Sequence, residues 1–446
     1  MFHHNKHEQH PKLKRSLSIF DATIYGIGVI IGAGIYALIG QGAGIAGSSV
    51  WISFIFAGII AGFSALSYAE LSSMFPKAGA EFNFVKHAFG SNFLAFFTGY
   101  CGIFANAVSV AVVALAFAGY LQGLVALPLV PIALALIIAM SLLNFTGIKE
   151  SARYTLISTL LEVGGIILII ILGASFIGSA NVFEVPDPAN FAGSIFSAAA
   201  LIFFAFVGFE QVANISEETK NAARNIPKAV LLSLLLTTII YILVSIVSIS
   251  AIPWAELSES TNPIALVAGK VIGPEGSFIL SIIALFATSN TVLVLLIVAS
   301  RMLYGISKQS ALPSFFQKIH ESTQTPYIAV FAAMILSAIF LLIEDLGKIA
   351  LLSNYFIFMM FFMVNASAIK FRFTHPNAER PFKIPFSIGN IPVIPLLGAA
   401  SCLFMLLYIN EPLTLFGITL PLVLYGVLLS LLAAPIYLAF KHRIQN

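Results

Sequence analysis

Residues 26–36 read GIGVIIGAGIY, an apolar run whose glycines are Gly26, Gly28, Gly32 and Gly34. Glycine costs a helix about 1 kcal/mol per position relative to alanine, so these glycines need a structural reason. One reason is close packing of helices through small residues. The other is an unwound backbone, which is tolerated at membrane depth only where it is buried in protein or lines an aqueous cavity. This stretch alone supports both interpretations equally.

The composition of the chain requires a membrane. Of its 446 residues, 59% are hydrophobic and 9% are charged, whereas soluble domains have roughly 45–50% apolar and about 25% charged residues. The charged residues fall between long apolar runs, which excludes a soluble enzyme with one anchor and a disordered chain. Cys101 and Cys402 both lie in apolar runs, so the sequence offers no disulfide framework and no metal-ligand spacing. We expect an integral membrane protein with no cofactor, no metal and no nucleic-acid partner.

Twelve apolar stretches are long enough to cross a bilayer as helices of about 20 residues. We place them at 17–40, 48–71, 93–123, 127–146, 152–177, 194–214, 229–251, 277–305, 327–343, 348–369, 392–409 and 415–440. The polar segments 1–16 and 441–446 are the terminal tails.

The basic residues give the orientation, because lysine and arginine near span ends accumulate on the cytoplasmic side. With the N-terminus inside and the loops alternating, 20 of the 22 basic residues fall on the inner side, and only Lys270 and Lys348 fall outside. One missed span would scramble this alternation, so the span count and the orientation support each other. We expect a multi-pass protein of the cell membrane with both termini cytoplasmic. The net charge of +3 is then a topological signal and requires no anionic ligand.

A second interrupted stretch lies in span 6. Residues 197–212 read SAAALIFFAFVGFEQV, with Gly208 in the middle and Glu210 close behind it. Spans 1 and 6 begin two five-span halves, and paired interrupted helices at matching positions indicate an inverted-repeat transporter with its site at the midplane. Free N–H groups at half-helix N-termini favour an anionic group, and exposed carbonyls accept from a cationic group, so a zwitterion fits.

Five strings, in order and on the expected sides, resemble the amino acid, polyamine and organocation permease superfamily. They are IGAGIY (31–36), YAELSSMFPKAGAEF (68–82), FFAFVGFEQV (203–212), EETKNAARNIPKAV (217–230) and SRMLYGISKQSALP (300–313). The resemblance implies an all-α membrane protein with a five-plus-five inverted repeat, broken helices 1 and 6, and two C-terminal helices. The repeats would occupy 17–177 and 194–369, and the added helices 392–440. It also implies amino acids or related amines as substrates, moved by alternating access.

The resemblance also implies a substrate site. The carboxylate-binding backbone falls on Ala33 and Gly34, and the ring of Phe204 is the aromatic gate over the ligand. Ordinary packing is the alternative for the apolar residues, and helix–helix hydrogen bonds are the alternative for the asparagines. The full set is Ile30, Gly32, Ala33, Gly34, Asn106, Phe204, Phe206, Val207, Gly208, Asn290 and Leu295, with the carbonyls of Ile30, Phe204 and Val207 accepting from the amino group.

Glu162 is the first candidate for ion coupling. Many superfamily members have a lysine on span 5 that resembles a substitute for a sodium ion, and this sequence has Glu162 there. It lies roughly 13 Å along the helix from Arg153, close to the bilayer centre. An ionised side chain there costs about 3 kcal/mol, so we expect it to be paired, hydrated or protonated, and we interpret it as a proton carrier. A permanently neutral acid bonded between helices is the alternative.

Glu210 and Ser289 complete the predicted ion-coupling set. The superfamily often has an acid at the position of Glu210, although a structural helix cap is the alternative role. Ser289 belongs to a run of hydroxyl and amide residues, 288–291, that could face Glu162 and form a sodium site. We favour the proton, because every sodium ligand besides the acid would have to be inferred.

The predicted function is proton-coupled import of neutral amino acids. An amino acid exchanger, a sodium symporter and a transport-inactive amino acid sensor are the alternatives. All 8 histidines lie in the tails or cytoplasmic segments, so no acid, base or metal cluster within the membrane indicates an enzyme. Ala105 and Asn106 stand where some relatives with cationic substrates have an acid, which favours neutral substrates, while Glu210 leaves cationic ones open.

Overall fold

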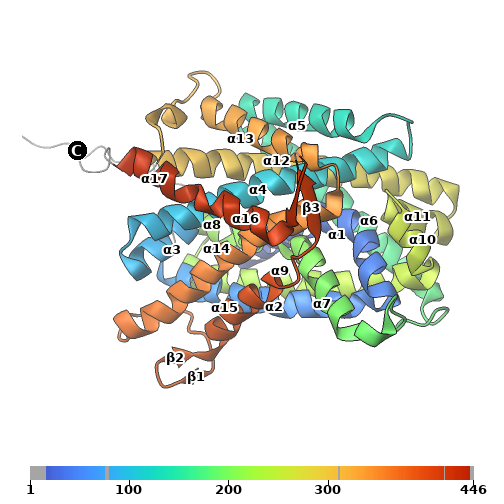
Figure 1. Ribbon diagram of the computed structural model, residues 1–446, viewed down its shortest axis with the longest axis horizontal. Coiled ribbons are helices and arrows are strands. Elements are labelled where there is room, and N and C mark those ends of the chain that lie inside the picture. The colour runs from blue at the N-terminus through green and yellow to red at the C-terminus, as the bar shows by residue number, and fades with distance from the viewer. Residues whose placement is uncertain (1–16, 76–79, 310–311, 416, 442–446) are drawn as a thin grey trace, which may run out of the picture.

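The computed structural model describes residues 17–75, 80–309, 312–415 and 417–441, and these residues are almost entirely helical (Figure 1). The predicted tail 1–16 and residues 442–446 of the predicted C-terminal tail lie outside this part of the chain. The first half of the chain forms α1 (Ile19–Ala46), α2 (Val50–Met74), α3 (Ala80–Phe89), α4 (Asn92–Gln122), α5 (Leu129–Thr146) and α6 (Ile148–Gly173).

The second half continues with the helices α7 (Phe191–Ile202), α8 (Gln211–Asn214), α9 (Ala222–Ala251), α10 (Trp254–Glu259), α11 (Pro263–Val271), α12 (Pro274–Lys308), α13 (Tyr327–Phe340), α14 (Leu346–Thr374), α15 (Val393–Leu406), α16 (Leu422–Leu431) and α17 (Ala433–Lys441). Short 3₁₀ turns are η1 (Gly47–Ser49), η2 (Ala174–Phe176), η3 (Pro188–Asn190), η4 (Phe203–Phe206), η5 (Ser216–Glu218), η6 (Ser314–Gln317) and η7 (Leu341–Ile343). Two antiparallel hairpins pair β1 (Ser387–Ile388) with β2 (Ile391–Pro392) and β3 (Pro412–Leu415) with β4 (Ile418–Pro421).

Each predicted apolar stretch contains a helix, which confirms a multi-span helical membrane protein. Among the described residues, nine helical segments are long and apolar enough to cross a membrane, and the first of them, Ile19–Met74, holds both α1 and α2. Two further apolar helices, Tyr327–Ile343 and Val393–Leu406, are shorter. The count of twelve spans and the repeat boundaries stay predictions.

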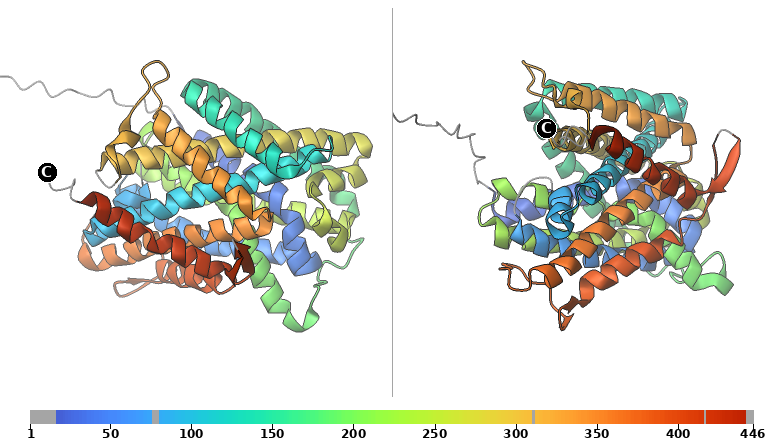
Figure 2. Two further views of the ribbon diagram at one scale, coloured as in Figure 1. Left: turned by 45° about the horizontal axis from the view of Figure 1, so that its top comes forward. Right: turned by 60° about the vertical axis from the view of Figure 1, so that its left-hand side comes forward.

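The helices form an inner and an outer group. In the most apolar stretch of α4 (Asn92–Gln122), 89% of the residues are buried. In the most apolar stretch of Leu422–Phe440, 22% of the residues are buried. α4 packs against α12 and α14, and α2 packs against α9. Figure 2 shows α5 and the pair α16 and α17 along the outside of the bundle. The outer helices therefore present their apolar side chains to lipid, and α1 lies inside.

The start of α1 is fixed by a capping box. The Ser18 hydroxyl accepts a hydrogen bond from the backbone N–H of Asp21 at 3.2 Å, and the Asp21 carboxylate accepts one from the backbone N–H of Ser18 at 2.8 Å. This reciprocal pair satisfies two N–H groups that a helix start leaves free. Just before it, Leu17 exchanges backbone hydrogen bonds with Glu218 and Lys220. The start of α1 is thereby tied to the loop that follows span 6.

Candidate functional site

The glycine-rich stretch of α1 is both kinked and closely packed. Gly32 has φ 6° and ψ −149°, which interrupts the helix at this one residue. A Cβ atom on Gly34 would lie 2.5 Å from the Cα atom of Ala205. Only glycine therefore lets the backbone of α1 approach η4 this closely. The two reasons for the glycine cluster that the sequence left open both apply.

Span 6 is broken where the sequence predicts it. α7 ends at Ile202, η4 follows, and residues 207–210 are not α-helical before α8 begins. Gly208 has φ +125°, a conformation that side chains disfavour, and a Cβ atom there would lie 2.9 Å from the Val29 carbonyl oxygen. The breaks in spans 1 and 6 therefore pack directly on each other.

Tyr241 on α9 connects the two breaks. Its buried hydroxyl lies 2.7 Å from the Ile30 carbonyl oxygen and 2.8 Å from the Ala205 carbonyl oxygen. A phenol has one proton, so it donates to one carbonyl at a time. The Phe206 ring packs edge-on against Tyr241 with ring centroids 5.3 Å apart. Phe206 is fully buried in this contact and does not line the cavity described next.

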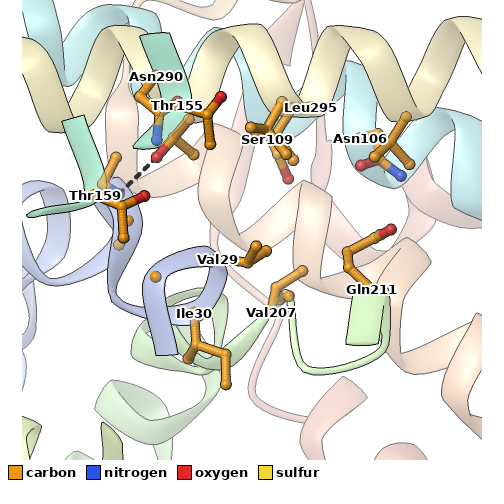
Figure 3. A pocket seen from close by; sticks show the side chains of 18 of the residues that line it. Val29, Ile30, Asn106, Ser109, Thr155, Thr159, Val207, Gln211, Asn290 and Leu295 are labelled. Atoms are coloured by element: carbon orange, nitrogen blue, oxygen red, sulfur yellow. Dashed lines mark hydrogen bonds between the residues drawn. The ribbon is translucent and has the colours of Figure 1, made fainter. Parts of the chain in front are cut away.

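A cavity lies between the two breaks, α4, α6 and α12 (Figure 3). The predicted site residues that line it are Ile30, Gly32, Ala33, Gly34, Asn106, Phe204, Val207, Gly208, Glu210, Asn290 and Leu295. The predicted residues that do not line it are Phe206, Glu162 and Ser289. The structure thus brings most of the predicted set to one place, and the roles of these residues stay predictions.

Nine lining residues are not in the set predicted from the sequence: Gly28, Val29, Ser109, Thr155, Thr159, Gln211, Thr291, Val294 and Val298. Helical spacing could have found several of them. Asn290, Val294 and Val298 follow one another at four-residue intervals and so lie on one face of α12. The same spacing joins Thr155 to Thr159 on α6. Once one residue of a helix is assigned to the site, its neighbours one turn away are candidates.

Polar groups lie at two ends of this cavity. In Figure 3, Thr155, Thr159 and Asn290 lie at one end, and Asn106 and Gln211 lie at the other. Val29, Val207 and Leu295 lie between these ends, together with Ser109, whose hydroxyl is hydrogen-bonded to the Ser353 hydroxyl. A ligand with polar groups and an apolar body therefore matches the distribution of the lining residues.

The end near α1 has one donor in use and one acceptor without a partner. The backbone N–H of Ala33 donates to the Thr291 hydroxyl oxygen at 3.0 Å, and that hydroxyl lies 3.0 Å from the Ala287 carbonyl oxygen. Asn290 is buried, and its Oδ1 atom has no hydrogen-bond partner among the described residues. An unsatisfied buried acceptor costs roughly 1–3 kcal/mol, and a ligand N–H group would remove that cost.

Glu210 hydrogen-bonds back to the break in span 6. Its Oε2 atom accepts a hydrogen bond from the backbone N–H of Gly208 at 2.8 Å, and its Oε1 atom lies 3.3 Å from Nε2 of Gln211. The residue is 3% exposed. This is not a helix cap, because the Glu210 side chain makes no cap hydrogen bond to α8 and accepts instead from a residue that precedes it. The same side chain also lines the cavity. The structural role and a role in coupling are therefore compatible.

Glu162 lies behind the cavity on α6. The residue is fully buried, and neither carboxylate oxygen has a hydrogen bond of standard geometry among the described residues. Thr159, one turn earlier, interacts with this carboxyl group and also lines the cavity. Ser289 is engaged elsewhere, because its hydroxyl lies 2.5 Å from the Leu285 carbonyl oxygen and 2.6 Å from the Tyr154 hydroxyl.

Comparison with known proteins places this architecture in a family. The family model for amino acid permeases matches residues 17–432. The branched-chain amino acid permease BcaP of Bacillus subtilis is 34% identical, over 89% of this chain and 88% of that protein. The methylthioribose transporter of the same organism is 31% identical, over 88% of each chain. The vacuolar cationic amino acid transporter 4 of Arabidopsis thaliana is 27% identical, over 82% of this chain and 64% of that protein.

The family match covers nearly all of the described helices, including both breaks and the cavity between them. Its members are transporters and not enzymes. The chain belongs to the amino acid permease family of the amino acid, polyamine and organocation superfamily.

Proposed function

We propose that this protein is a secondary transporter that imports neutral, apolar amino acids across the cell membrane together with a proton. The single observation that carries the proposal is the cavity at the meeting point of the two helix breaks. Backbone groups are free to bind a ligand only where a membrane helix is interrupted. The placement of the basic residues supports cytoplasmic termini.

The α-amino and α-carboxylate groups of the substrate bind at the α1 end of the cavity. The carboxylate accepts from the backbone N–H groups of Ala33 and Gly34. It replaces the Thr291 hydroxyl, which now accepts from Ala33 at 3.0 Å. A charge-assisted hydrogen bond is stronger than a neutral one, so this exchange is favourable. The ammonium group donates to exposed carbonyls of the breaks and to Oδ1 of Asn290.

The substrate side chain lies along α12. Val294, Leu295 and Val298 form an apolar strip there, and Val29 and Val207 face the same cavity. Among the described residues, no lysine, arginine or aspartate lines it, and the one acid that does, Glu210, accepts a hydrogen bond from the Gly208 N–H. The relative named as a branched-chain amino acid permease supports a branched aliphatic side chain as the first candidate. The methylthioribose relative makes a thioether sugar a second candidate.

Glu162 carries the coupling proton. The buried Glu162 carboxyl group has no ion-pair partner among the described residues, and burial favours its neutral form, so we assign it a proton in this state. Thr159 links it to the cavity, where substrate and water enter. The hydroxyls of Thr288 and Ser289 lie within hydrogen-bond distance of carbonyls on their own helix, at 2.6 and 2.5 Å. We favour a proton over a sodium ion, because every sodium ligand besides the acid would have to be inferred.

The test is uptake of radiolabelled leucine and valine into proteoliposomes under a pH gradient, a sodium gradient, or preloading with unlabelled amino acid. Methylthioribose is added as a competitor. We expect uptake driven by the pH gradient in the wild type and loss of that drive in Glu162→Gln, with exchange retained. Glu275→Gln, which changes an exposed glutamate at the start of α12, is the matched control and should behave as wild type.

Other outcomes assign the alternatives. Uptake that requires internal amino acid and is unchanged by Glu162→Gln would make the protein an exchanger. Uptake driven by sodium alone would identify a sodium symporter. Ligand binding without uptake under any gradient would indicate a sensor. Inhibition of leucine uptake by methylthioribose would make a thioether sugar a second substrate.

A further inference from the structure

A buried charge cluster holds the segment that follows α14 against the end of α2. The Glu70 carboxylate is fully buried on α2. It accepts hydrogen bonds from Nη2 of Arg372 at 2.5 Å, from Nε of Arg380 at 3.2 Å and from the backbone N–H of Ile384 at 2.8 Å. One carboxylate thus joins α2, α14 and the segment 375–384. We call this group the Glu70 cluster.

A second contact continues the attachment. The backbone N–H of Phe382 donates to the Ser73 hydroxyl at 3.2 Å, one turn after Glu70 on α2. The Arg380 guanidinium also binds the carbonyl oxygens of Phe371 and His375, which close the last turn of α14. The chain is therefore held in place up to residue 384. α15 begins at Val393, so the short β1–β2 hairpin between these points is fixed at both ends.

The hairpin presents an apolar edge. Phe386 is 77% exposed and Ile388 is 74% exposed, which makes them the two most exposed large apolar side chains in the described part of the chain. Ile391, which pairs with Ile388 across the hairpin, is 43% exposed. Nothing in the described fold of this chain covers these side chains. In water such an edge would be a site of aggregation, so its exposure needs a partner.

The position of the hairpin identifies that partner. Figures 1 and 2 show the hairpin at the edge of the bundle, beside the start of α15. On the first turn of α15, Leu396 and Leu397 are 49% and 45% exposed, so the apolar edge of the hairpin continues into the lipid-facing surface of that helix. Lys370 and Lys383 are exposed nearby in sequence, together with one acid, Glu379. Apolar side chains flanked by lysine are typical of segments that lie in the membrane interface.

We infer that the β1–β2 hairpin is an interfacial anchor. Phe386 and Ile388 insert at the boundary between headgroups and acyl chains of the leaflet in which α14 ends. Lys370 and Lys383 meet its phosphate groups. The Glu70 cluster holds the hairpin at this depth, so the anchor fixes the height of α2 and α14 relative to the lipid. This inference about the hairpin rests only on the membrane-spanning arrangement of the helices. It holds whichever substrate or ion the protein moves.

The test measures the depth of the hairpin directly. The variant Ile388→Cys is labelled with a polarity-sensitive fluorophore and reconstituted into nanodiscs of phosphatidylcholine and phosphatidylglycerol. The fluorophore labels the native cysteines only weakly, because Cys101 and Cys402 are both buried. The matched control is Glu321→Cys, an exposed position in the polar loop before α13. Quenching is measured with lipids that carry a nitroxide near the headgroup and with aqueous iodide.

We expect the lipid nitroxide to quench the label at position 388 several-fold more strongly than the label at 321, and iodide to show the reverse order. Equal and strong iodide quenching at both positions would place the hairpin in water and overturn the inference. Protection of position 388 from both quenchers would indicate contact with protein and would overturn it as well. In that case, dilution of the protein in the bilayer would distinguish a second copy of this chain.

Discussion

The hydroxyl of Tyr241 lies 2.7 Å from the carbonyl oxygen of Ile30 and so binds α9 to the break in α1. The same hydroxyl lies 2.8 Å from the Ala205 carbonyl oxygen in the break of span 6. In the alternating-access mechanism proposed for this protein, one group of helices rocks against the other around the site. One phenol that can donate to either break is therefore placed to hold both breaks together in this state.

We predict that Tyr241→Phe destabilises the protein by about 1 kcal/mol, since one backbone carbonyl loses its donor while the ring stays packed. The measurement is thermal unfolding in detergent, followed by the reaction of a fluorogenic maleimide with the buried Cys101 and Cys402 as they become exposed. The matched control is Tyr425→Phe. That residue is half-buried and also donates to a backbone carbonyl, of Ile418 at 2.7 Å, but this hydrogen bond is exposed to solvent. Equal shifts for the two variants would contradict the prediction.

We predict that Gly208→Ala abolishes uptake and lowers thermal stability by several kelvin or prevents folding. The backbone there has φ +125°, and the added Cβ would lie 2.9 Å from the Val29 carbonyl oxygen. Gly178→Ala separates the two effects, because Gly178 has φ +94° but no atom within 4 Å of the added Cβ. The control should lose only about 1–2 kcal/mol of stability and keep uptake. If Gly178→Ala proved as damaging as Gly208→Ala, contact between the two breaks would not be the cause.

These positions indicate how far the sequence predicts the site. The glycines of α1 and Gly208 report the breaks, because glycine weakens a helix interior and is favoured there where the backbone bends or packs closely. Phe206, which the resemblance assigns to the substrate site, does not line the cavity described here, since an aromatic residue beside a break can face the cavity or the opposite side. In the structure its ring faces Tyr241 and Phe54, whose position depends on how α2 and α9 pack. Contacts between distant helices, such as Thr291 with Ala33, have no signal in local sequence.

The contact between Thr291 and Ala33 gives a prediction about affinity. If a substrate carboxylate replaces the Thr291 hydroxyl at the Ala33 N–H, then Thr291→Val removes the competitor and leaves the donor free. A net hydrogen bond contributes about 0.5–1.5 kcal/mol, so we expect the Kd for substrate to fall by up to about tenfold. The measurement is scintillation proximity binding of labelled leucine to purified protein.

Thr291→Ser is the matched control for that experiment, because it keeps the hydroxyl and should keep the Kd of the wild type. Weaker binding in Thr291→Val, with normal binding in Thr291→Ser, would mean that the hydroxyl itself contacts the substrate. That result would contradict the exchange proposed at Ala33. It would leave the rest of the cavity assignment unchanged.

The Glu70 cluster predicts a large loss of stability from a small chemical change. Glu70→Gln keeps the shape of the side chain but leaves the guanidinium of Arg372, which is 7% exposed, without a counter-charge. Removal of one partner from a buried ion pair costs about 3–5 kcal/mol. Asp345→Asn is the control: Asp345 pairs with Lys348 at 3.7 Å on the surface, and its loss should cost about 0–1 kcal/mol. Thermal unfolding of both variants checks the contrast. The double variant Glu70→Gln with Arg372→Met should recover part of the stability, because no buried charge is then left unpaired at position 372. If the double variant recovers no stability, Glu70 stabilises the protein by holding Arg380 and Ile384 and not by neutralising Arg372.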